Sequence, residues 1–291
     1  MSGSLEYDHV RRLTPADTDW PAELADLEQG APAGLWVAGA IETLAARPRV
    51  AIVGTRRATR YGLRVTEALT AALARAGACI VSGLAAGIDG AAHRAALDAG
   101  GATIAVLGTG LGHAFPKGHR ALQLAVSQRG LLISELEHEE HGMPFTFPER
   151  NRIIAALAQL TIVVEAPPRS GALNTAEHAL RLNRTVAAIP GPIDQPQSQG
   201  TNLLIRDGAQ PIATVEDALA LVSLTPPLRT PRLDPSGDEG RVWAALADGA
   251  LDIDTLCHRS GLPAAQCLAA VTTLELAGSL ECALTGEIRR R

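Results

Sequence analysis

Short strand-like runs alternate with helix-like segments from Arg49 to Val222, and this alternation limits the possible folds more than any other feature of the chain. The runs have the length and the apolar content of buried strands. Such an alternation predicts an α/β fold, extended Rossmann-like and doubly wound around a mostly parallel sheet. The expected strands are Val50–Val53, Cys79–Val81, Thr103–Leu107, Leu131–Ser134, Leu160–Glu165 and Thr185–Ile189. The expected helices are Tyr61–Ala76, Asp89–Ala99, His119–Gln128, Arg150–Leu157, Asn174–Leu182 and Val215–Val222.

The flanking segments predict a chain of four parts. Residues 1–48 are interpreted as a lead-in, with a short strand at Leu35–Val37, that packs on a main domain of residues 49–224. Residues 225–237 hold four prolines without apolar periodicity, which is typical of a linker. Residues 238–291 have the pattern of a small winged-helix domain. Its expected elements are helices at Gly240–Ala247, Ile253–Arg259 and Ala264–Leu276, and paired strands at Leu280–Leu284 and Glu287–Arg290 around a Thr285-Gly286 turn.

Composition excludes several classes of protein. The net charge of −5 does not favour a general polyanion binder, but residues 49–222 carry 16 basic against 14 acidic side chains and form the only part with a basic excess. Lys117 is the only lysine. The four cysteines have no paired spacing, which favours reduced thiols over disulfides or zinc. We see no bilayer-spanning run and no signal peptide, and we therefore expect a cytoplasmic protein without membrane contact.

Glycines, hydroxyls and cations follow the ends of three predicted strands. The segments are Gly54–Arg57, Ser82–Asp89 and Gly108–Lys117. Because strand-to-helix loops of a parallel sheet share one edge, we expect these segments to lie together. Glycine lets the backbone approach an anion, and consecutive N–H groups form a nest for it.

The segment Phe147–Leu180 adds two further loops of this kind. Arg150-Asn151-Arg152 is expected in the first turn of one helix, and Ser170-Gly171 precedes another helix that carries Asn174 and Thr175 near its start. Helix N-termini favour anions and disfavour cations. A bound anion would therefore account for Arg150 and Arg152.

Some patterns allow two interpretations. Gly108-x-Gly110 is half of a dinucleotide fingerprint, but it follows the third strand and His113 stands where the last glycine belongs. Asp89 and His93 are either an acid/base pair or a helix cap with a buried histidine. His138–His141 is either a metal site or, as we favour, a solvated acidic loop.

No Ser–His–Asp or Cys–His constellation stands out in the sequence. An extended row of anion contacts without catalytic groups suits a ligand with several phosphates, such as single-stranded nucleic acid. Phe115 and Phe147 lie beside these loops and either stack on bases or pack beneath the loops. No metal or cofactor is expected.

Five long blocks resemble the DNA-processing protein DprA (Smf) family: VAIVGTRRATRYG, VSGLAAGIDGAAHRAAL, AVLGTGLGHAFPKGHRAL, FPERNRIIAALAQLTIVVEAPPRSGALNTAEHAL and AAIPGPIDQPQSQGTNLLIRDGA. The match covers about Leu35 to Val222, and the tail is similar to the family's winged-helix module. The resemblance implies a non-enzymatic homodimer that binds and protects single-stranded DNA. It also implies loading of the recombinase RecA in natural transformation.

The resemblance places the family's DNA-contacting glycine–hydroxyl–Arg motif on Gly54, Thr55 and Arg56, and its loop lysine on Lys117. It places the Arg-Asn-Arg motif on residues 150–152 and the Ser-Gly motif on residues 170–171. The complete set of candidate contacts is Gly54, Thr55, Arg56, Gly110, Lys117, Phe147, Arg150, Asn151, Arg152, Ser170, Gly171 and Thr175. The chain departs from the family pattern at Gly112, Phe115, His119 and residues 136–137, which affects local loop shape.

Two alternative functions remain from the sequence. Ser170–Glu177 is similar to the Gly-Gly-x-Gly-Thr-x-x-Glu motif of lysine-decarboxylase-like hydrolases, which release a base from a nucleotide, although the spacing differs by one and two glycines are replaced. A regulator acting through the winged helix is the other alternative. Its expected recognition helix, Pro263–Leu276, has no Lys or Arg, and only Arg289–Arg291 offer basic charge. We therefore expect that helix not to read duplex DNA, and its Ala- and Leu-rich surface suits a protein contact or packing on the main domain.

Overall fold

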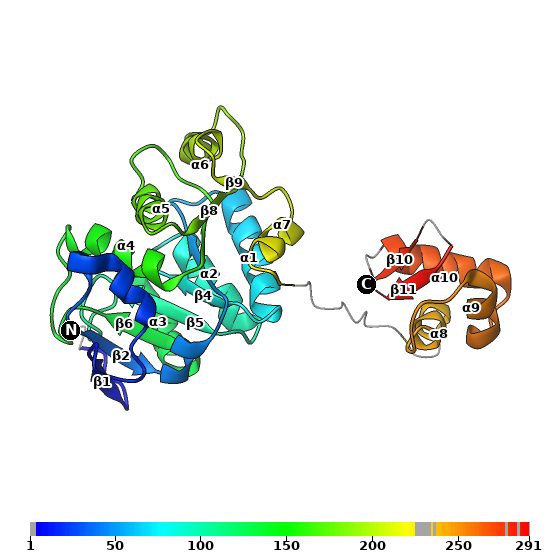
Figure 1. Ribbon diagram of the computed structural model, residues 1–291, viewed down its shortest axis with the longest axis horizontal. Helices are drawn as coiled ribbons and strands as arrows, with labels where there is room; N and C mark the ends of the chain where they lie inside the picture. Colours follow the sequence, from blue (N-terminus) through cyan, green and yellow to red (C-terminus); the bar gives the residue numbers. More distant parts are fainter. Residues whose placement is uncertain (1–3, 225–233, 235–236, 277–278, 284–285, 291) are drawn as a thin grey trace. The chain divides into compact units, whose positions relative to one another are not determined.

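The computed structural model describes residues 4–224, 234, 237–276, 279–283 and 286–290. The chain divides into two compact units, Met1–Pro226 and Pro227–Arg291 (Figure 1). Among the described residues, no helix is both long and apolar enough to cross a bilayer.

The first unit is built on a nine-stranded sheet with the order β1-β2-β6-β5-β4-β3-β7-β8-β9. All pairs from β6 to β9 across the sheet are parallel, whereas β2 pairs antiparallel with both β1 and β6. The expected fold class is therefore confirmed. The strands are β1 Val10–Leu13, β2 Leu35–Gly39, β3 Arg49–Val53, β4 Cys79–Ser82, β5 Thr103–Leu107, β6 Leu131–Ser134, β7 Leu160–Val163, β8 Thr185–Ala188 and β9 Gln210–Pro211.

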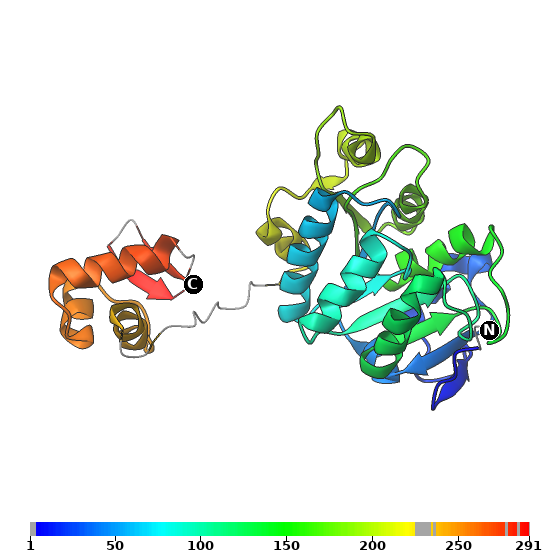
Figure 2. The same cartoon turned by 180° about the vertical axis from the view of Figure 1, so that it is seen from behind.

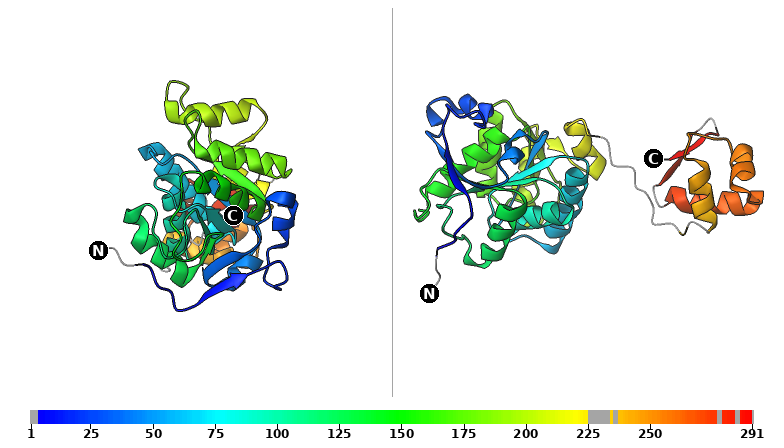
Figure 3. Two further views of the ribbon diagram at one scale, coloured as in Figure 1. Left: turned by 90° about the vertical axis from the view of Figure 1, so that its left-hand side faces the viewer. Right: turned by 90° about the horizontal axis from the view of Figure 1, so that it is seen from below.

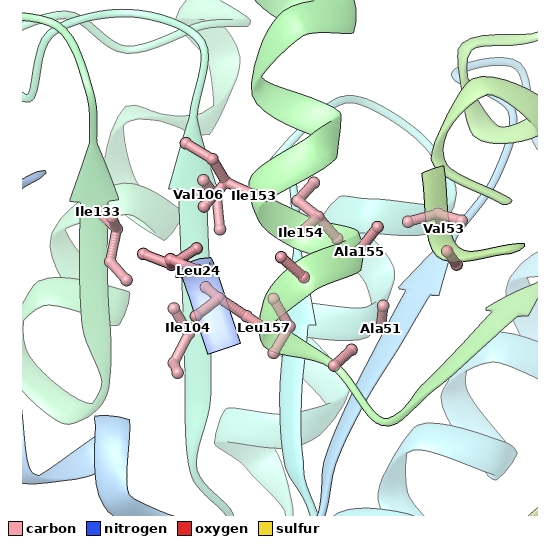
Figure 4. Packing of buried hydrophobic residues seen from close by; sticks show 14 of the residues in the cluster. Leu24, Ala51, Val53, Ile104, Val106, Ile133, Ile153, Ile154, Ala155 and Leu157 are labelled. Carbon is pink, nitrogen blue, oxygen red and sulfur yellow. The ribbon is translucent and has the colours of Figure 1, made fainter. Parts of the chain in front are cut away.

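Helices cover both faces of this sheet (Figures 2 and 3). Alternate residues of each strand face opposite layers: Val50 and Ile52 of β3 pack with α1 and α2, and Ala51 and Val53 pack with α4. Figure 4 shows Ile153 and Leu157 of α4 among the strand residues of that second layer. The helices are η1 Ala22–Gly30, η2 Ile41–Ala45, α1 Arg60–Arg75, α2 Ile88–Asp98, η3 Lys117–His119, α3 Arg120–Arg129, α4 Thr146–Leu157, α5 Gly171–Arg181, α6 Pro196–Arg206 and α7 Val215–Leu221.

The structure corrects several expected boundaries. Helix α4 begins at Thr146, so Arg150 and Arg152 lie in its second turn and not in the first. Pro148 is accommodated near the start of α4, where its missing N–H costs no hydrogen bond. The lead-in adds β1 and β2 to the sheet instead of only packing on it. The sequence did not predict β1, because only Leu13 of this strand is buried. It did not predict α6, because that helix begins with polar residues.

In its described residues, the second unit has three helices and a two-stranded antiparallel sheet around its own apolar core. Val242, Leu256, Val271 and Leu274 belong to that core. The expected turn residue Thr285 and most of the expected linker lie outside the described residues. The elements are α8 Asp238–Ala245, α9 Ile253–Ser260, α10 Ala264–Leu276, β10 Leu280–Cys282 and β11 Ile288–Arg290.

A buried ion pair ties η1 to the start of β3. The side chain of Arg49 is fully buried, and its guanidinium lies 2.5 Å from Glu23 Oε1. Burial alone would raise the pKa of the Glu23 carboxyl, but a hydrogen bond from its own backbone N–H and the charges of Arg49 and Arg47 outweigh burial and hold the pKa below its usual range. A lowered pKa of a carboxyl in the folded state stabilises the fold above about pH 4.3, and this contribution is lost as the pH falls through the folded-state pKa.

Replacing Glu23 by Gln should lower the free energy of unfolding by about 3 kcal/mol, because it leaves the buried Arg49 charge without a counterion. Asp26→Asn is the matched control from the same η1 segment, since its pair with Arg184 is half exposed and should be worth less than about 1 kcal/mol. Urea unfolding followed by circular dichroism at pH 7 measures both. Equal losses in the two variants would contradict the assignment.

Candidate nucleic-acid interface

A pocket of about 330 Å³ opens at the carboxyl ends of the central strands. The β3–α1 loop, the start of α4 and the β7–α5 loop form its walls. It brings together most of the residues predicted as contacts, which are Gly54, Thr55, Arg56, Phe147, Arg150, Asn151, Ser170, Gly171 and Thr175.

The β3–α1 loop is held close to its neighbours by backbone contacts. The N–H of Thr55 donates to the carbonyl of Glu165 at 2.7 Å, and its carbonyl accepts from Ile88. A Cβ added at Gly54 would lie 2.4 Å from Ile88 Cγ1, so only glycine fits there. The loop is thus fixed by β7 and α2 before it reaches Arg56.

Arg56 is an exposed cation above two aromatic rings. Its guanidinium carbon lies 5.9 Å from the ring centroid of Phe115 and 5.7 Å from that of Phe147, and the two centroids are 4.7 Å apart. Such cation–π contacts restrict a guanidinium without consuming its N–H donors. Phe115 is 45% exposed, whereas Phe147 also packs against Gly108. Of the two interpretations, packing fits Phe147, and the exposed ring of Phe115 is accessible to a base.

The buried side chain of Arg150 connects α4 with the end of β4 and with β5. Its Nη1 donates to the carbonyl of Gly83 at 2.8 Å and to that of Val106, and its Nε donates to Asn151 Oδ1 at 3.2 Å. Burial lowers the pKa of Arg150 to about 10, opposed by the charge of Asp89. The guanidinium therefore stays charged at neutral pH and lines the pocket, although its Nε and Nη1 already have partners.

The start of α5 forms the opposite wall. Ser170 caps this helix by accepting from the N–H of Ala172 at 3.3 Å, and Asn151 Nδ2 donates to the carbonyl of Gly171 at 3.2 Å. Gly171 is exposed, and a Cβ added to it would meet nothing within 4 Å. The open N-terminus of α5 thus borders the pocket and suits an anion.

Three predicted contacts lie elsewhere. Arg152 Nη2 donates to both carboxylate oxygens of Glu135, at 2.8 and 2.9 Å, so a carboxylate of the chain, rather than a bound anion, accounts for this cation. The N–H of Gly110 donates to the carbonyl of Glu140 within the packed acidic loop. Lys117 is exposed at the start of η3 and does not line the pocket. Conversely, the exposed Arg57, which is not among the candidate contacts predicted from the sequence, does line it.

The histidine patterns of the sequence contribute no acid/base pair to the pocket. His93 is fully buried, its Nδ1 lies 2.8 Å from Thr103 Oγ1, and burial lowers its pKa to about 3. Asp89 accepts from the N–H of Gly83 at 3.1 Å, and Gly87, not Asp89, stands at the N-cap of α2. Burial raises the pKa of the Asp89 carboxyl, opposed by Arg150. The described residues contain no group of three metal-ligating side chains.

These features define the class: a Rossmann-like α/β protein with a cationic, glycine-rich pocket at the strand ends and a second winged-helix unit. Residues 11–223 match the family model described as DNA recombination-mediator protein A, and residues 226–283 match that of the DprA winged helix domain. The chain belongs to the DNA recombination-mediator protein A (DprA) family, which confirms the resemblance seen in the sequence.

Similar proteins agree with this assignment. A putative DNA processing protein DprA of Mycobacterium tuberculosis is 40% identical over 298 residues, covering 94% of this chain and 75% of its own length. The solved structure of DprA from Streptococcus pneumoniae gives a TM-score of 0.70 at 41% identity, covering 74% of this chain and 75% of that one. A Helicobacter pylori DprA structure, described by its single-stranded DNA binding mode, gives 0.67 at 30% identity, covering 76% and 100%.

The two glycines of the pocket should tolerate substitution differently. Gly54→Ala should lower the free energy of unfolding by about 2 kcal/mol because the added methyl group collides with Ile88. Gly171→Ala is the matched control, since its Cβ enters open space and should change stability by less than about 0.5 kcal/mol. Urea unfolding measures both variants, and a neutral Gly54→Ala would show that the loop can move away from α2.

Proposed function

We propose that the chain binds single-stranded DNA across this pocket and acts as a non-enzymatic recombination mediator. The observation that carries the proposal is Arg56, an exposed guanidinium held above aromatic rings at the mouth of a pocket that also borders a helix N-terminus. Phosphates need exposed donors and bases need exposed rings, and both lie within this site. The described binding mode of the H. pylori relative supports the same ligand.

Charge in the pocket favours a polyanion. Arg56 and Arg57 are exposed, and neither forms an ion pair within the described part of the chain. The carboxylate among the lining residues, Asp89, is buried and accepts a backbone hydrogen bond. A phosphate at the mouth therefore meets donors and no exposed acid.

The base-releasing hydrolase is not favoured. Its motif would use Glu177 in chemistry, but this side chain is exposed and pairs with Arg181 one turn later on α5. Glu177 does not line the pocket. A surface carboxylate bound to its helical neighbour is poorly placed to act on a nucleotide held there.

Arg56→Ala combined with Lys117→Ala should weaken binding of a dT oligomer by about tenfold or more, because it removes two exposed cations, Arg56 in the pocket and Lys117 outside its lining. Arg152→Gln should leave the affinity unchanged, because Glu135 and Gly30 occupy its guanidinium. Fluorescence anisotropy at two salt concentrations measures all three proteins. Unchanged affinity in the double variant would remove these two residues from the site.

Each described arginine of the second unit already has a hydrogen-bond or ion-pair partner, unlike Arg56. Arg289 pairs with Glu281, and Arg259 pairs with Asp248. Arg290 stacks 4.5 Å from the ring centroid of Trp243 and donates to its carbonyl. Arg241 donates to the carbonyl of Gly261, and Arg291 lies outside the described residues.

Removing residues 227–291 should leave the affinity for a dT oligomer within about twofold of the full chain, since these arginines are already engaged. In the same titration with duplex DNA, the truncated chain should bind with no loss of affinity relative to the full chain. A large drop in either affinity on truncation would show that the winged helix contributes phosphate contacts.

The proposal extends to partners and place of action. We propose that the protein protects incoming single strands, loads RecA onto them during natural transformation, works as a homodimer and acts in the cytoplasm. The family description as a recombination mediator supports the role with a recombinase. Light scattering of the purified chain tests the dimer, and RecA filament formation on protein-coated single strands tests loading.

A further inference from the structure

A second cleft lies at the next strand ends along the sheet, separated from the pocket by the β3–α1 loop. It encloses about 700 Å³ between the start of α1 and the β8–α6 loop. Its lining includes Thr59, Arg60, Tyr61, Glu165, Gln195 and Ser198. We propose that this cleft binds a further nucleotide of the same single strand, with its phosphate on the arginines of α1 and its base against Tyr61. This proposal rests on the function proposed above.

Tyr61 provides a fixed surface for a base. Its hydroxyl donates to the carbonyl of Pro190 at 3.1 Å, and the residue is 36% exposed. The guanidinium carbon of Arg64 lies 5.8 Å from the ring centroid. Pro190 and Pro192 add apolar walls, and the amide of Gln195 can bond a base edge. A ring held by its hydroxyl loses little further freedom when a base stacks on it.

Arginines at the start of α1 suit the phosphates. Arg57, Arg60 and Arg64 are exposed, follow one another at intervals of three and four residues, and form no ion pair with any described residue. Arg57 borders the pocket and Arg60 borders the cleft. Three residues of chain span at most about 10 Å, so one backbone can contact both.

Glu165 determines whether the base or the phosphate of the nucleotide enters the cleft. This carboxylate is 2% exposed, and its two oxygens accept from the N–H and the hydroxyl of Thr59. It repels a phosphate from the cleft interior, whereas an uncharged base is accepted there. The phosphate therefore fits at the arginine rim, with the base directed inward.

Charge along the sheet edge also favours a strand that runs from the pocket toward the second cleft. The loop after β6 exposes Glu137, Glu139 and Glu140, and β6 and β8 lie on opposite sides of β3 in the sheet. A phosphate backbone that leaves the pocket is repelled toward β8 by these carboxylates. The second cleft lies on that side.

A length series of dT oligomers tests the cleft. In the wild-type chain, affinity should rise once an oligomer is long enough to reach beyond the pocket. Arg60→Ser with Tyr61→Leu should remove that rise, a loss of about tenfold for long oligomers, and should leave the shortest binding oligomer unaffected. Arg75→Ser, an exposed arginine at the far end of α1, is the matched control and should change neither. Tyr61→Phe keeps the ring and should retain most of the rise.

Photocrosslinking locates the contact. A 5-iodouracil oligomer should crosslink to the peptide containing Tyr61 in the wild-type chain, and free thymidine monophosphate should not compete at equal concentration. Competition by the monophosphate would assign the cleft to a free nucleotide instead of a strand. If short oligomers bind but affinity does not rise with length and no crosslink forms at Tyr61, the proposal for the cleft is wrong, while the proposed function stands. A wild-type chain that binds no oligomer of any length overturns the proposed function as well.

Discussion

The shape of the binding edge depends on the buried guanidinium of Arg150. It joins α4 to the carbonyls of Gly83 and Val106, and thereby fixes the ends of β4 and β5 against the helix above them. Burying an unpartnered charge costs several kcal/mol, but each hydrogen bond to this cation repays part of that cost. Because its pKa remains about 10, the group is still charged at neutral pH. One residue therefore organises the pocket and supplies positive potential inside it, while Arg56 is left exposed to solvent.

The buried carboxylate of Glu165 also fixes the β3–α1 loop. The Glu165 carboxylate accepts from Thr59, which also caps α1, and a Cβ added at Gly62 would lie 2.3 Å from Glu165 Oε2. One buried carboxylate thus contacts both the loop and the first turn of α1 and restrains them. Arg56, Arg57 and Arg60 extend from a backbone whose conformation is settled before any ligand arrives. Such preorganisation lowers the entropic cost of ordering donors around a phosphate.

The sequence predicted the six central strands because each is a buried apolar run, and it predicted one binding edge because parallel strands end together. It could not identify the partners of individual arginines. Arg150 contacts carbonyls 67 and 44 residues away, and Arg152 pairs with a glutamate 17 residues earlier. These contacts arise only when loops from different strands meet. The argument from the helix dipole failed for the same pair because the sequence predicts a helix that begins at Arg150, whereas α4 begins at Thr146 and places both arginines in its second turn.

Pairing, rather than residue type, separates the structural cations of this chain from those proposed to bind the ligand. With Lys117 as its only lysine, the protein uses arginine for both purposes. Arg49, Arg152 and Arg184 each face a carboxylate and join segments distant in sequence. Arg56 instead faces aromatic rings, which hold it without neutralising its charge. A cation restrained by a π surface keeps its full attraction for phosphate, whereas a cation restrained by a carboxylate must first lose that partner. The placement of Phe115 and Phe147 under Arg56 therefore supports the proposal that Arg56 contacts phosphate, and sets it apart from the arginines that form ion pairs.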